Sequence, residues 1–355
     1  MKTWIGLAIS DEKLAKTVQT LLKVNNAAQV VGIYSDARGA AADLKHKGDV
    51  LVIYGIGNDP EGALRGLKVI QLSGPFPIIG VGSVIDAAPI LFDAFRLGML
   101  GFVPFSPEEI DSPTDSLLIE MTDSIQAVGE GNVGRITRAK LKPFKETEKT
   151  ELSEQAAYYV VLGIPRGGVN GAIKLLSQLP RRRDTALVAS LPIPHVSVGP
   201  FIADLNPYTQ WSIHPALEDE KISGGGCYLF SSFEPYTVEG TVDGKCRIIT
   251  RPKNTKPIDS IMENLAGSFG GSVIGVLLEG IGSDGIDGLS KVKSRGGTTL
   301  TIKPGTGVLT GAPAGTYPEG AADLLVDGDD LPKVLTTLMA EMYDIANINR
   351  MLVQE

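Results

Sequence analysis

Short apolar runs alternate with amphipathic helical patterns along most of this 355-residue chain. In the first 127 residues, the runs that predict strands are Ile5–Ile9, Gln29–Tyr34, Val50–Ile53, Ile78–Val81 and Gly101–Pro104. The helical stretches between them include Leu14–Leu22, Gly39–Lys45, Ala88–Leu97 and Glu108–Ile125. Because strands that alternate with helices pair in parallel and are covered on both faces, this half predicts a doubly wound parallel sheet.

The same alternation starts again near residue 157. Strands are predicted at Tyr159–Leu162, Ala186–Leu191, Cys227–Phe230, Arg247–Thr250, Val273–Leu278 and Thr298–Ile302. Helices are predicted at Val169–Leu179, Ile258–Ser268, Gly285–Ser294 and from Leu331 to the C-terminus. The predicted fold class is therefore α/β, with two doubly wound parallel-sheet domains at residues 1–127 and 157–355.

Residues 128–156 differ from both halves because basic residues stand among few apolar ones. The basic residues are Arg135, Arg138, Lys140, Lys142, Lys145 and Lys149. We interpret this segment as an interdomain linker, helical in part, whose charges are solvated or dock on an acidic partner.

Charge and cysteine content exclude several classes of protein. The net charge is −8, so the chain lacks the basic footprint of a protein that binds nucleic acid or an anionic membrane. No run approaches the ~18 apolar residues of a membrane span, and no signal-peptide core is present, which predicts a cytoplasmic protein. The two isolated cysteines, Cys227 and Cys246, predict reduced thiols.

The turn that follows the strand Tyr159–Leu162 carries the strongest functional information. It reads Gly163-Ile164-Pro165-Arg166-Gly167-Gly168 and leads directly into a helix. A hydrolase of this architecture would place a serine nucleophile in such a turn, but Pro165 has no side-chain oxygen. Arg166 is either an exposed loop residue or a contact for a carboxylate or phosphate.

Several motifs in the second half occur in a fixed order. They are Gly167-Gly168, Leu179-Pro180, Pro215–Asp219, Pro257-Ile258-Asp259, Leu278-Glu279-Gly280-Ile281-Gly282-Ser283-Asp284-Gly285, Gly296-Gly297 and Gly311-Ala312-Pro313. This ordered set resembles the catalytic domain of the chemotaxis protein-glutamate methylesterases, whose signature near the end reads Leu-Thr-Gly-Met-Gly-x-Asp-Gly. The first half resembles a response-regulator receiver domain. Together the two resemblances cover nearly the whole chain.

The resemblance implies a Ser-His-Asp triad, and this chain departs from it at two of the three positions. The serine position is Pro165 and the histidine position is Pro192, while Asp284 is retained. A shift of three residues would instead bring His195 to the histidine position. Asp284 is therefore either a vestige of the catalytic acid or a cap of the helix that begins near Gly285. The expectation is a protein that is not an esterase by the family mechanism.

The receiver-like half departs from its family in the same way. The resemblance implies an acidic pair for Mg²⁺, here Asp11 and Glu12 or Ser10 and Asp11, and a phosphate-accepting aspartate, whose position is Tyr54. The family's lysine position is Phe105. We therefore expect neither Mg²⁺ nor another cofactor, and no phosphorylation of the usual kind.

Three functions follow from these observations. The leading hypothesis is a pseudoenzyme of signal transduction that binds a receptor, a histidine kinase or another partner in a chemosensory or two-component pathway. The second is an active methylesterase or deamidase with a rearranged site that uses His195 and Asp284. The third is a protein that binds an anionic small molecule in the vestigial cleft through Arg166.

Overall fold

The computed structural model of the protein describes residues 3–24, 28–129, 131–144, 152–153, 155–241, 244–250, 256–309, 311–318 and 320–353. Lys145 and Lys149 of the basic segment lie outside these residues. The elements up to the linker are β1 (Thr3–Ala8), α1 (Glu12–Val24), β2 (Ala28–Tyr34), α2 (Ala37–Leu44), β3 (Val50–Ile56), α3 (Pro60–Ser73), β4 (Ile78–Gly82), α4 (Val84–Ala87), η1 (Ala88–Ile90), α5 (Leu91–Arg96), β5 (Met99–Pro104), α6 (Pro107–Asp111), α7 (Asp115–Gly129) and η2 (Val133–Arg135).

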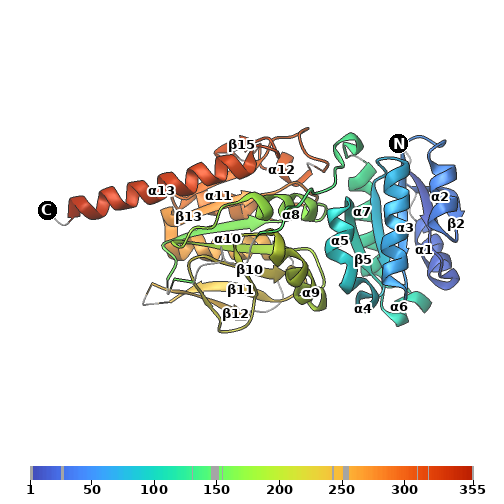
Figure 1. The fold of residues 1–355 in the computed structure, drawn as a ribbon, viewed down its shortest axis with the longest axis horizontal. Helices are drawn as coiled ribbons and strands as arrows, with labels where there is room; N and C mark the ends of the chain where they lie inside the picture. The colour runs from blue at the N-terminus through green and yellow to red at the C-terminus, as the bar shows by residue number, and fades with distance from the viewer. Residues whose placement is uncertain are drawn as a thin grey trace.

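The first domain is built on a five-stranded parallel sheet with the strand order β2-β1-β3-β4-β5. Apolar residues of α1 and α7 cover one face of the sheet, and those of α2, α3 and α5 cover the other (Figure 1). The stretch Glu108–Ile125, predicted as one helix, is divided into α6 and α7. Pro113 lies between the two helices, and proline cannot continue a helix because it lacks an N–H.

The second domain contains a seven-stranded parallel sheet with the order β15-β14-β13-β6-β7-β10-β8. Its elements, with those that surround it, are β6 (Tyr158–Gly163), α8 (Val169–Gln178), β7 (Thr185–Leu191), α9 (His195–Leu205), η4 (Asn206–Tyr208), β8 (Ser212–Pro215), β9 (Lys221–Ile222), β10 (Gly226–Ser231), β11 (Tyr236–Gly240), β12 (Cys246–Thr250), α10 (Pro257–Phe269), η5 (Gly270–Ser272), β13 (Val273–Leu277), α11 (Ile286–Ser294), β14 (Thr298–Ile302), α12 (Gly311–Gly315), β15 (Leu324–Val326) and α13 (Leu331–Val353).

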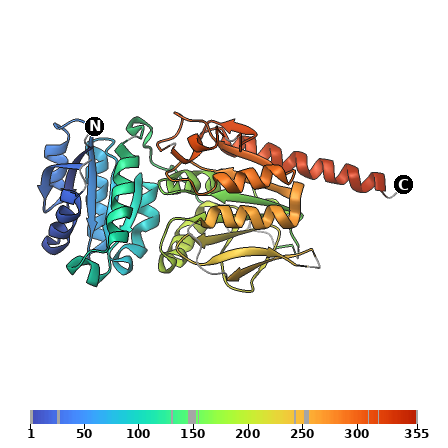
Figure 2. The same ribbon diagram turned by 180° about the vertical axis from the view of Figure 1, so that it is seen from behind.

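Helices cover both faces of this second sheet. Helices α8, α9 and α13 pack on one face, and α10 and α11 pack on the other (Figure 2). The predicted fold class, two doubly wound α/β domains, is confirmed. One predicted strand is placed differently: Arg247–Thr250 belongs to β12 of a separate antiparallel sheet with the order β11-β12-β9. Its alternating burial is typical of a sheet with one buried face.

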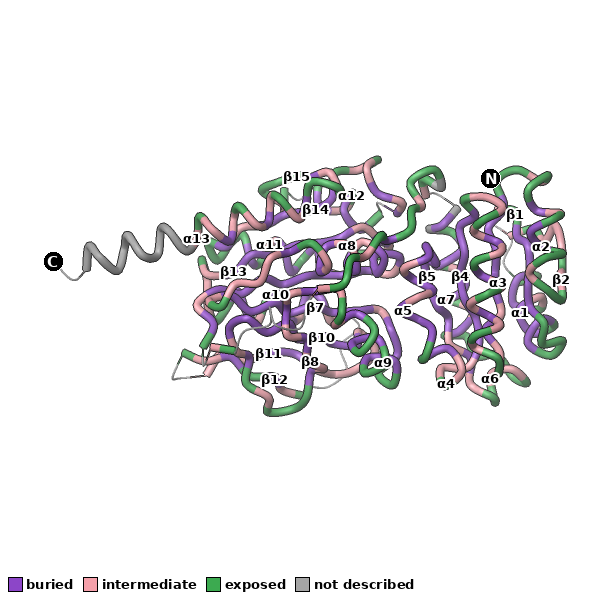
Figure 3. Tube along the Cα trace, viewed as in Figure 1, coloured by how far each residue is buried: buried purple, intermediate pink, exposed green. Residues whose placement is uncertain are grey.

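The two domains pack against each other along one side of each sheet. Figure 3 shows where buried residues lie along the trace of both domains. A single cluster of buried apolar residues includes members of α3 and α5 of the first domain and of α8 and α9 of the second. At its centre, the ring of Phe92 lies edge-on to Phe201 and stacks on Tyr208, with centroid distances of 5.4 and 6.2 Å. Helix α13 leaves the second domain on the side away from the first (Figure 1).

The predicted linker follows the surface between the domains. Within its described part, the only helical turn is η2, so the expected partial helix is short. The Ala139 N–H donates to the carbonyl oxygen of Arg96 at 2.9 Å, and the Phe144 N–H donates to that of Pro207 at 2.8 Å. Both domains therefore hold the linker. None of the helices in the described residues combines the length and apolar character that a bilayer span requires.

Candidate functional site

The turn after β6 has the compact geometry that the sequence predicts. The Gly168 N–H donates to the Pro165 carbonyl at 3.0 Å, and Gly167 adopts a positive φ of 93°, which glycine tolerates. The loop after β13 is fixed on this turn because the Ile281 N–H donates to the Arg166 carbonyl at 3.0 Å. Pro165 is buried at the position where a nucleophile would stand, and it offers no heteroatom.

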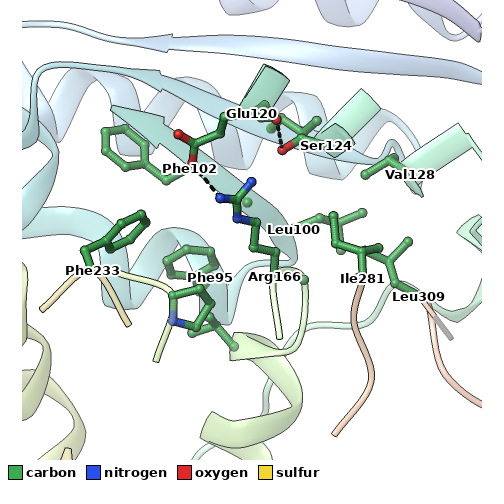
Figure 4. A pocket seen from close by; sticks show the side chains of 15 residues that line it. Phe95, Leu100, Phe102, Glu120, Ser124, Val128, Arg166, Phe233, Ile281 and Leu309 are labelled. Carbon is green, nitrogen blue, oxygen red and sulfur yellow. Dashed lines mark hydrogen bonds and ion pairs between the residues drawn. The ribbon is translucent and has the colours of Figure 1, made fainter. Parts of the chain in front are cut away.

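Arg166 extends from this turn toward the first domain. Its Nη2 lies 3.5 Å from Oε1 of Glu120 on α7, and Figure 4 shows the two side chains meeting across the interface. The pKa of Glu120 is raised, because the effect of burial exceeds the opposing attraction of the Arg166 guanidinium. The residue proposed as an anion contact is therefore engaged by a carboxylate of the protein itself.

Little space remains between the turn and the first domain. The cavity there has a volume of about 20 Å³, close to what one water molecule needs. Its walls come from Pro192, Arg166, Ile281 and Phe233 on one side and from β5, α5 and α7 on the other (Figure 4). The first domain thus occupies the region above the turn, and the geometry does not favour an anionic metabolite in this cleft.

A second polar contact across the interface was not predicted from the sequence. Asn170 on α8 is 7% exposed, and its Nδ2 donates to the carbonyl oxygens of Phe95 at 2.7 Å and Arg96 at 3.3 Å. These carbonyls end α5, where the last turn of a helix lacks the N–H donors of a following turn, and Asn170 adds a donor to each. The contact joins residues 75 positions apart, so no local pattern could have indicated it.

The histidine candidates do not form a catalytic pair in the described residues. Pro192 directly follows β7, and His195 begins α9 with an exposed side chain. The ring contact of His195 is with Tyr236, at a centroid distance of 6.3 Å. The hydroxyls of Ser190 and Ser197 are buried and lack a hydrogen-bond partner among the described residues. No described serine, threonine or cysteine is hydrogen-bonded to His195.

Asp284 caps a helix, but not the helix that the sequence suggested. Its Oδ2 accepts a hydrogen bond from the Ile258 N–H at 3.1 Å, and its Oδ1 accepts one from the Asp259 N–H at 2.9 Å, at the start of α10. The helix after Gly285, α11, is capped instead by Asp259, whose Oδ1 accepts from the Gly285 and Gly288 N–H groups at 2.8 and 2.6 Å. Burial raises the pKa of Asp284 to about 6.

The receiver-like site contains buried side chains where its family has reactive ones. Tyr54 lies within β3, and its hydroxyl donates to the Ala63 carbonyl of α3 at 2.8 Å; burial raises its pKa to about 12. Phe105 is buried directly after β5. Asp11 and Glu12 are exposed, and Oδ1 of Asp11 accepts from the Leu14 N–H at 2.9 Å as a cap of α1.

No group of three or more histidine, cysteine or acidic side chains in the described ranges is arranged to hold a metal ion. A carboxylate is required to accept phosphate as an acyl phosphate, and Tyr54 supplies none. The geometry of this half is therefore that of a packed core with capped helices.

The chain thus joins a five-stranded parallel α/β domain, with the strand order found in receiver domains and flavodoxins, to a seven-stranded α/β domain. Residues 160–335 match the family model described as CheB methylesterase. The resemblance to the CheB methylesterases that the motifs predicted is confirmed.

Relatives of known name match along most of the chain. The protein-glutamate methylesterase/protein-glutamine glutaminase of Lawsonia intracellularis is 24% identical over 340 residues, which cover 89% of this chain and 93% of the relative. The protein of the same description from Pyrococcus abyssi is 23% identical and covers 81% of this chain and 80% of the relative.

Two solved structures from Thermotoga maritima match one domain each. The CheB methylesterase catalytic domain is 24% identical, with a TM-score of 0.47, and covers 51% of this chain and 98% of that one. The response regulator domain of CheB is 17% identical, with a TM-score of 0.32, and covers 37% of this chain and 99% of that one.

Proposed function

We propose that this CheB-like protein is a non-catalytic component of a chemosensory pathway that acts by binding a protein partner. The observation that carries the proposal is Pro165 in the turn after β6. Ester hydrolysis by the family chemistry requires a hydroxyl beside an imidazole that takes its proton. The turn supplies no hydroxyl, and Pro192 stands at the position of the imidazole.

The remaining acid supports the same proposal. Both oxygens of Asp284 accept backbone N–H groups of α10, so its retention has a structural explanation. An enzyme that has lost its nucleophile and base keeps only the residual acceleration of its binding groups. The alternative of a rearranged site would need His195 beside a nucleophile, and its described contact is with the ring of Tyr236.

The domain arrangement suggests how such a protein would work. The Arg166–Glu120 pair, the Asn170 hydrogen bonds and the continuous apolar cluster hold the first domain on the turn after β6. Because Tyr54 has no carboxylate that could form an acyl phosphate, phosphorylation of the usual kind would not change this docking. We therefore propose a constitutively docked, cytoplasmic protein that needs no Mg²⁺ and binds a chemoreceptor or a histidine kinase.

The catalytic part of the proposal is tested with a methylated chemoreceptor fragment as substrate. The purified chain should release no methanol above the buffer rate, while an active methylesterase relative in parallel should demethylate the fragment. A fluorophosphonate serine probe should leave no covalent adduct on the chain. Methanol release that either His195→Ala or Asp284→Ala abolishes would show that the protein is an enzyme.

The binding part is tested separately, so that the two parts can fail independently. The receptor fragment and the cytoplasmic part of a pathway kinase are immobilised, and binding of the full chain is followed by surface plasmon resonance. We expect saturable binding to one of the two surfaces. Absence of binding to both would contradict a partner of this kind, whatever the outcome for methanol release.

A further inference from the structure

A second, larger cavity lies in the second domain, beside the carboxyl ends of β13 and β14. Its volume is about 300 Å³, enough for a small organic molecule. It is enclosed by α8, by the segment 306–308, by the start of α13 and by linker residues Arg135 and Thr137. In open α/β sheets, ligands bind outside the carboxyl ends of the strands, so the position itself is suitable for a binding site.

Two half-buried side chains of opposite charge line this cavity. Lys174 of α8 donates to Oγ1 of Thr137 at 2.6 Å, and Oε2 of Glu279 accepts from the Val308 N–H at 2.6 Å. These hydrogen bonds fix both side chains, but within the described residues neither charge has an ion-pair partner. Because both side chains line the same cavity, a molecule bound there can contact both.

The charges are costly in this position. Burial raises the pKa of Glu279 and lowers the pKa of Lys174, since each charged group loses hydration, and the attraction between the two side chains only partly opposes these shifts. A half-buried charge that forms no close ion pair destabilises a protein unless a group of opposite charge reaches it. At the exposed rim, Arg135 adds a second cation and Asp329 a second anion, while Leu175 and Ile302 supply buried apolar surface.

Glu279 is also a departure from the methylesterase signature. In the stretch that resembles Leu-Thr-Gly-Met-Gly-x-Asp-Gly, Glu279 stands at the threonine position. The acid that faces Lys174 across this cavity is therefore not part of the inherited motif, which is consistent with a site particular to this chain.

We propose that this cavity binds a small zwitterion of the α-amino acid class, with its carboxylate at Lys174 and its ammonium group at Glu279. Such a ligand satisfies both charges at once, which neither a simple acid nor a simple amine does. Because linker residues form one wall, the bound ligand also holds the linker on the second domain. The proposal does not depend on the absence of catalysis at the turn after β6.

The test is thermal unfolding of the full chain with each of the twenty proteinogenic amino acids at 10 mM, followed by isothermal titration calorimetry. A ligand that binds only the folded state stabilises it by RT ln(1 + [L]/Kd), so Tm rises with ligand concentration once this exceeds Kd. We expect at least one amino acid to raise Tm, and expect acetate and methylammonium at the same concentration to leave it unchanged. Lys174→Met and Glu279→Gln should each weaken binding at least 10-fold.

Matched controls separate this site from general charge effects. Lys333→Met and Glu341→Gln make the same changes at exposed positions of α13 outside the cavity and should leave the affinity unchanged. Glu279→Gln keeps an oxygen that can accept from the Val308 N–H, so this variant should fold, as circular dichroism will check. The proposal is overturned if no amino acid binds, if acetate or methylammonium gives the same Tm rise, or if either cavity variant binds as tightly as the original chain.

Discussion

If Asp284 serves to cap α10, its replacement by alanine should destabilise the second domain. The change removes the acceptor of two backbone N–H groups, those of Ile258 and Asp259. Loss of a helix cap typically costs about 0.5–2 kcal/mol, and leaving a partly buried donor unsatisfied costs about 1–3 kcal/mol. We therefore expect Asp284→Ala to lower the free energy of unfolding by about 2 kcal/mol at pH 5.5.

The size of this loss should depend on pH in a defined direction. The pKa of Asp284 is about 6 in the folded chain, above the ordinary value of 3.8 for an aspartate. At a pH between these two pKa values, the folded state binds more protons than the unfolded state. The free energy of unfolding of the original chain therefore falls as pH rises and Asp284 ionises. The alanine variant lacks this titration. From these two pKa values, the difference in the free energy of unfolding between the original chain and Asp284→Ala should shrink by roughly 1 kcal/mol between pH 5.5 and pH 8.

Urea unfolding followed by the fluorescence of Trp211, which is fully buried in the second domain, measures both quantities. The control is Asp287→Ala, because that carboxylate is exposed and its pair with Lys256 is on the surface. The control should lose less than about 1 kcal/mol. The capping role is refuted if Asp284→Ala unfolds at the same urea concentration as the original chain, or if the difference widens as pH rises.

Three further predictions concern the interface and the buried groups. Arg166→Ala should leave Glu120 without its cation and speed amide hydrogen exchange in α7 about 5-fold, the equivalent of about 1 kcal/mol. Arg166→Lys should have a smaller effect, and unchanged exchange in Arg166→Ala would contradict the docking role. Tyr54→Phe should destabilise the first domain by about 1 kcal/mol in thermal unfolding, because the hydrogen bond to Ala63 is lost. The original chain should take up no label from acetyl phosphate, and labelling would contradict the absence of a phosphate-accepting group at this site. Burial raises the thiol pKa of Cys246 to about 12 and also raises that of Cys227, so neither should react with Ellman's reagent until the chain is unfolded; rapid reaction in the folded state would count against the buried positions.

The sequence predicted the two sheets well because their strands are buried on both faces. Continuous apolar runs such as Tyr159–Leu162 and Val50–Ile53 are what parallel sheets require, and both are strands of the structure. The short strand β11, at Tyr236–Gly240, was not predicted because its stability comes from pairing with β12. Helix α9 was also missed, since Pro200 inside it weakens the helical pattern.

For the candidate site, the sequence predicted only which reactive side chains are missing. Pro165, Pro192 and Tyr54 are identified by aligning motifs, and the structure places each of them in a buried or partly buried position. The partners of Arg166 and Asn170 could not be predicted, because they lie on the other domain. Contacts between residues far apart in the sequence produce no local sequence pattern. Glu279 does leave a trace, as an acid within an otherwise glycine-rich signature.

The persistence of the signature glycines can be explained without any catalytic role. Gly280 has φ 149°, and a Cβ there would lie 2.6 Å from the Cβ of Pro165; Gly285 has φ 101°, and its Cβ would lie 2.6 Å from Cδ1 of Leu277. A larger residue at position 280 would push apart the turn after β6 and the loop after β13, and one at position 285 would meet the side chain of Leu277. Together with the positive φ angles, these contacts favour glycine at both positions. The positions of Pro165 and Pro192 are under no such constraint, because the reactive side chains that the family has there contribute little to the stability of the fold. A chain that has the glycines of a family signature without its nucleophile therefore has the fold of that family, but its activity does not follow from the signature. Its function must be argued from its own surfaces and cavities.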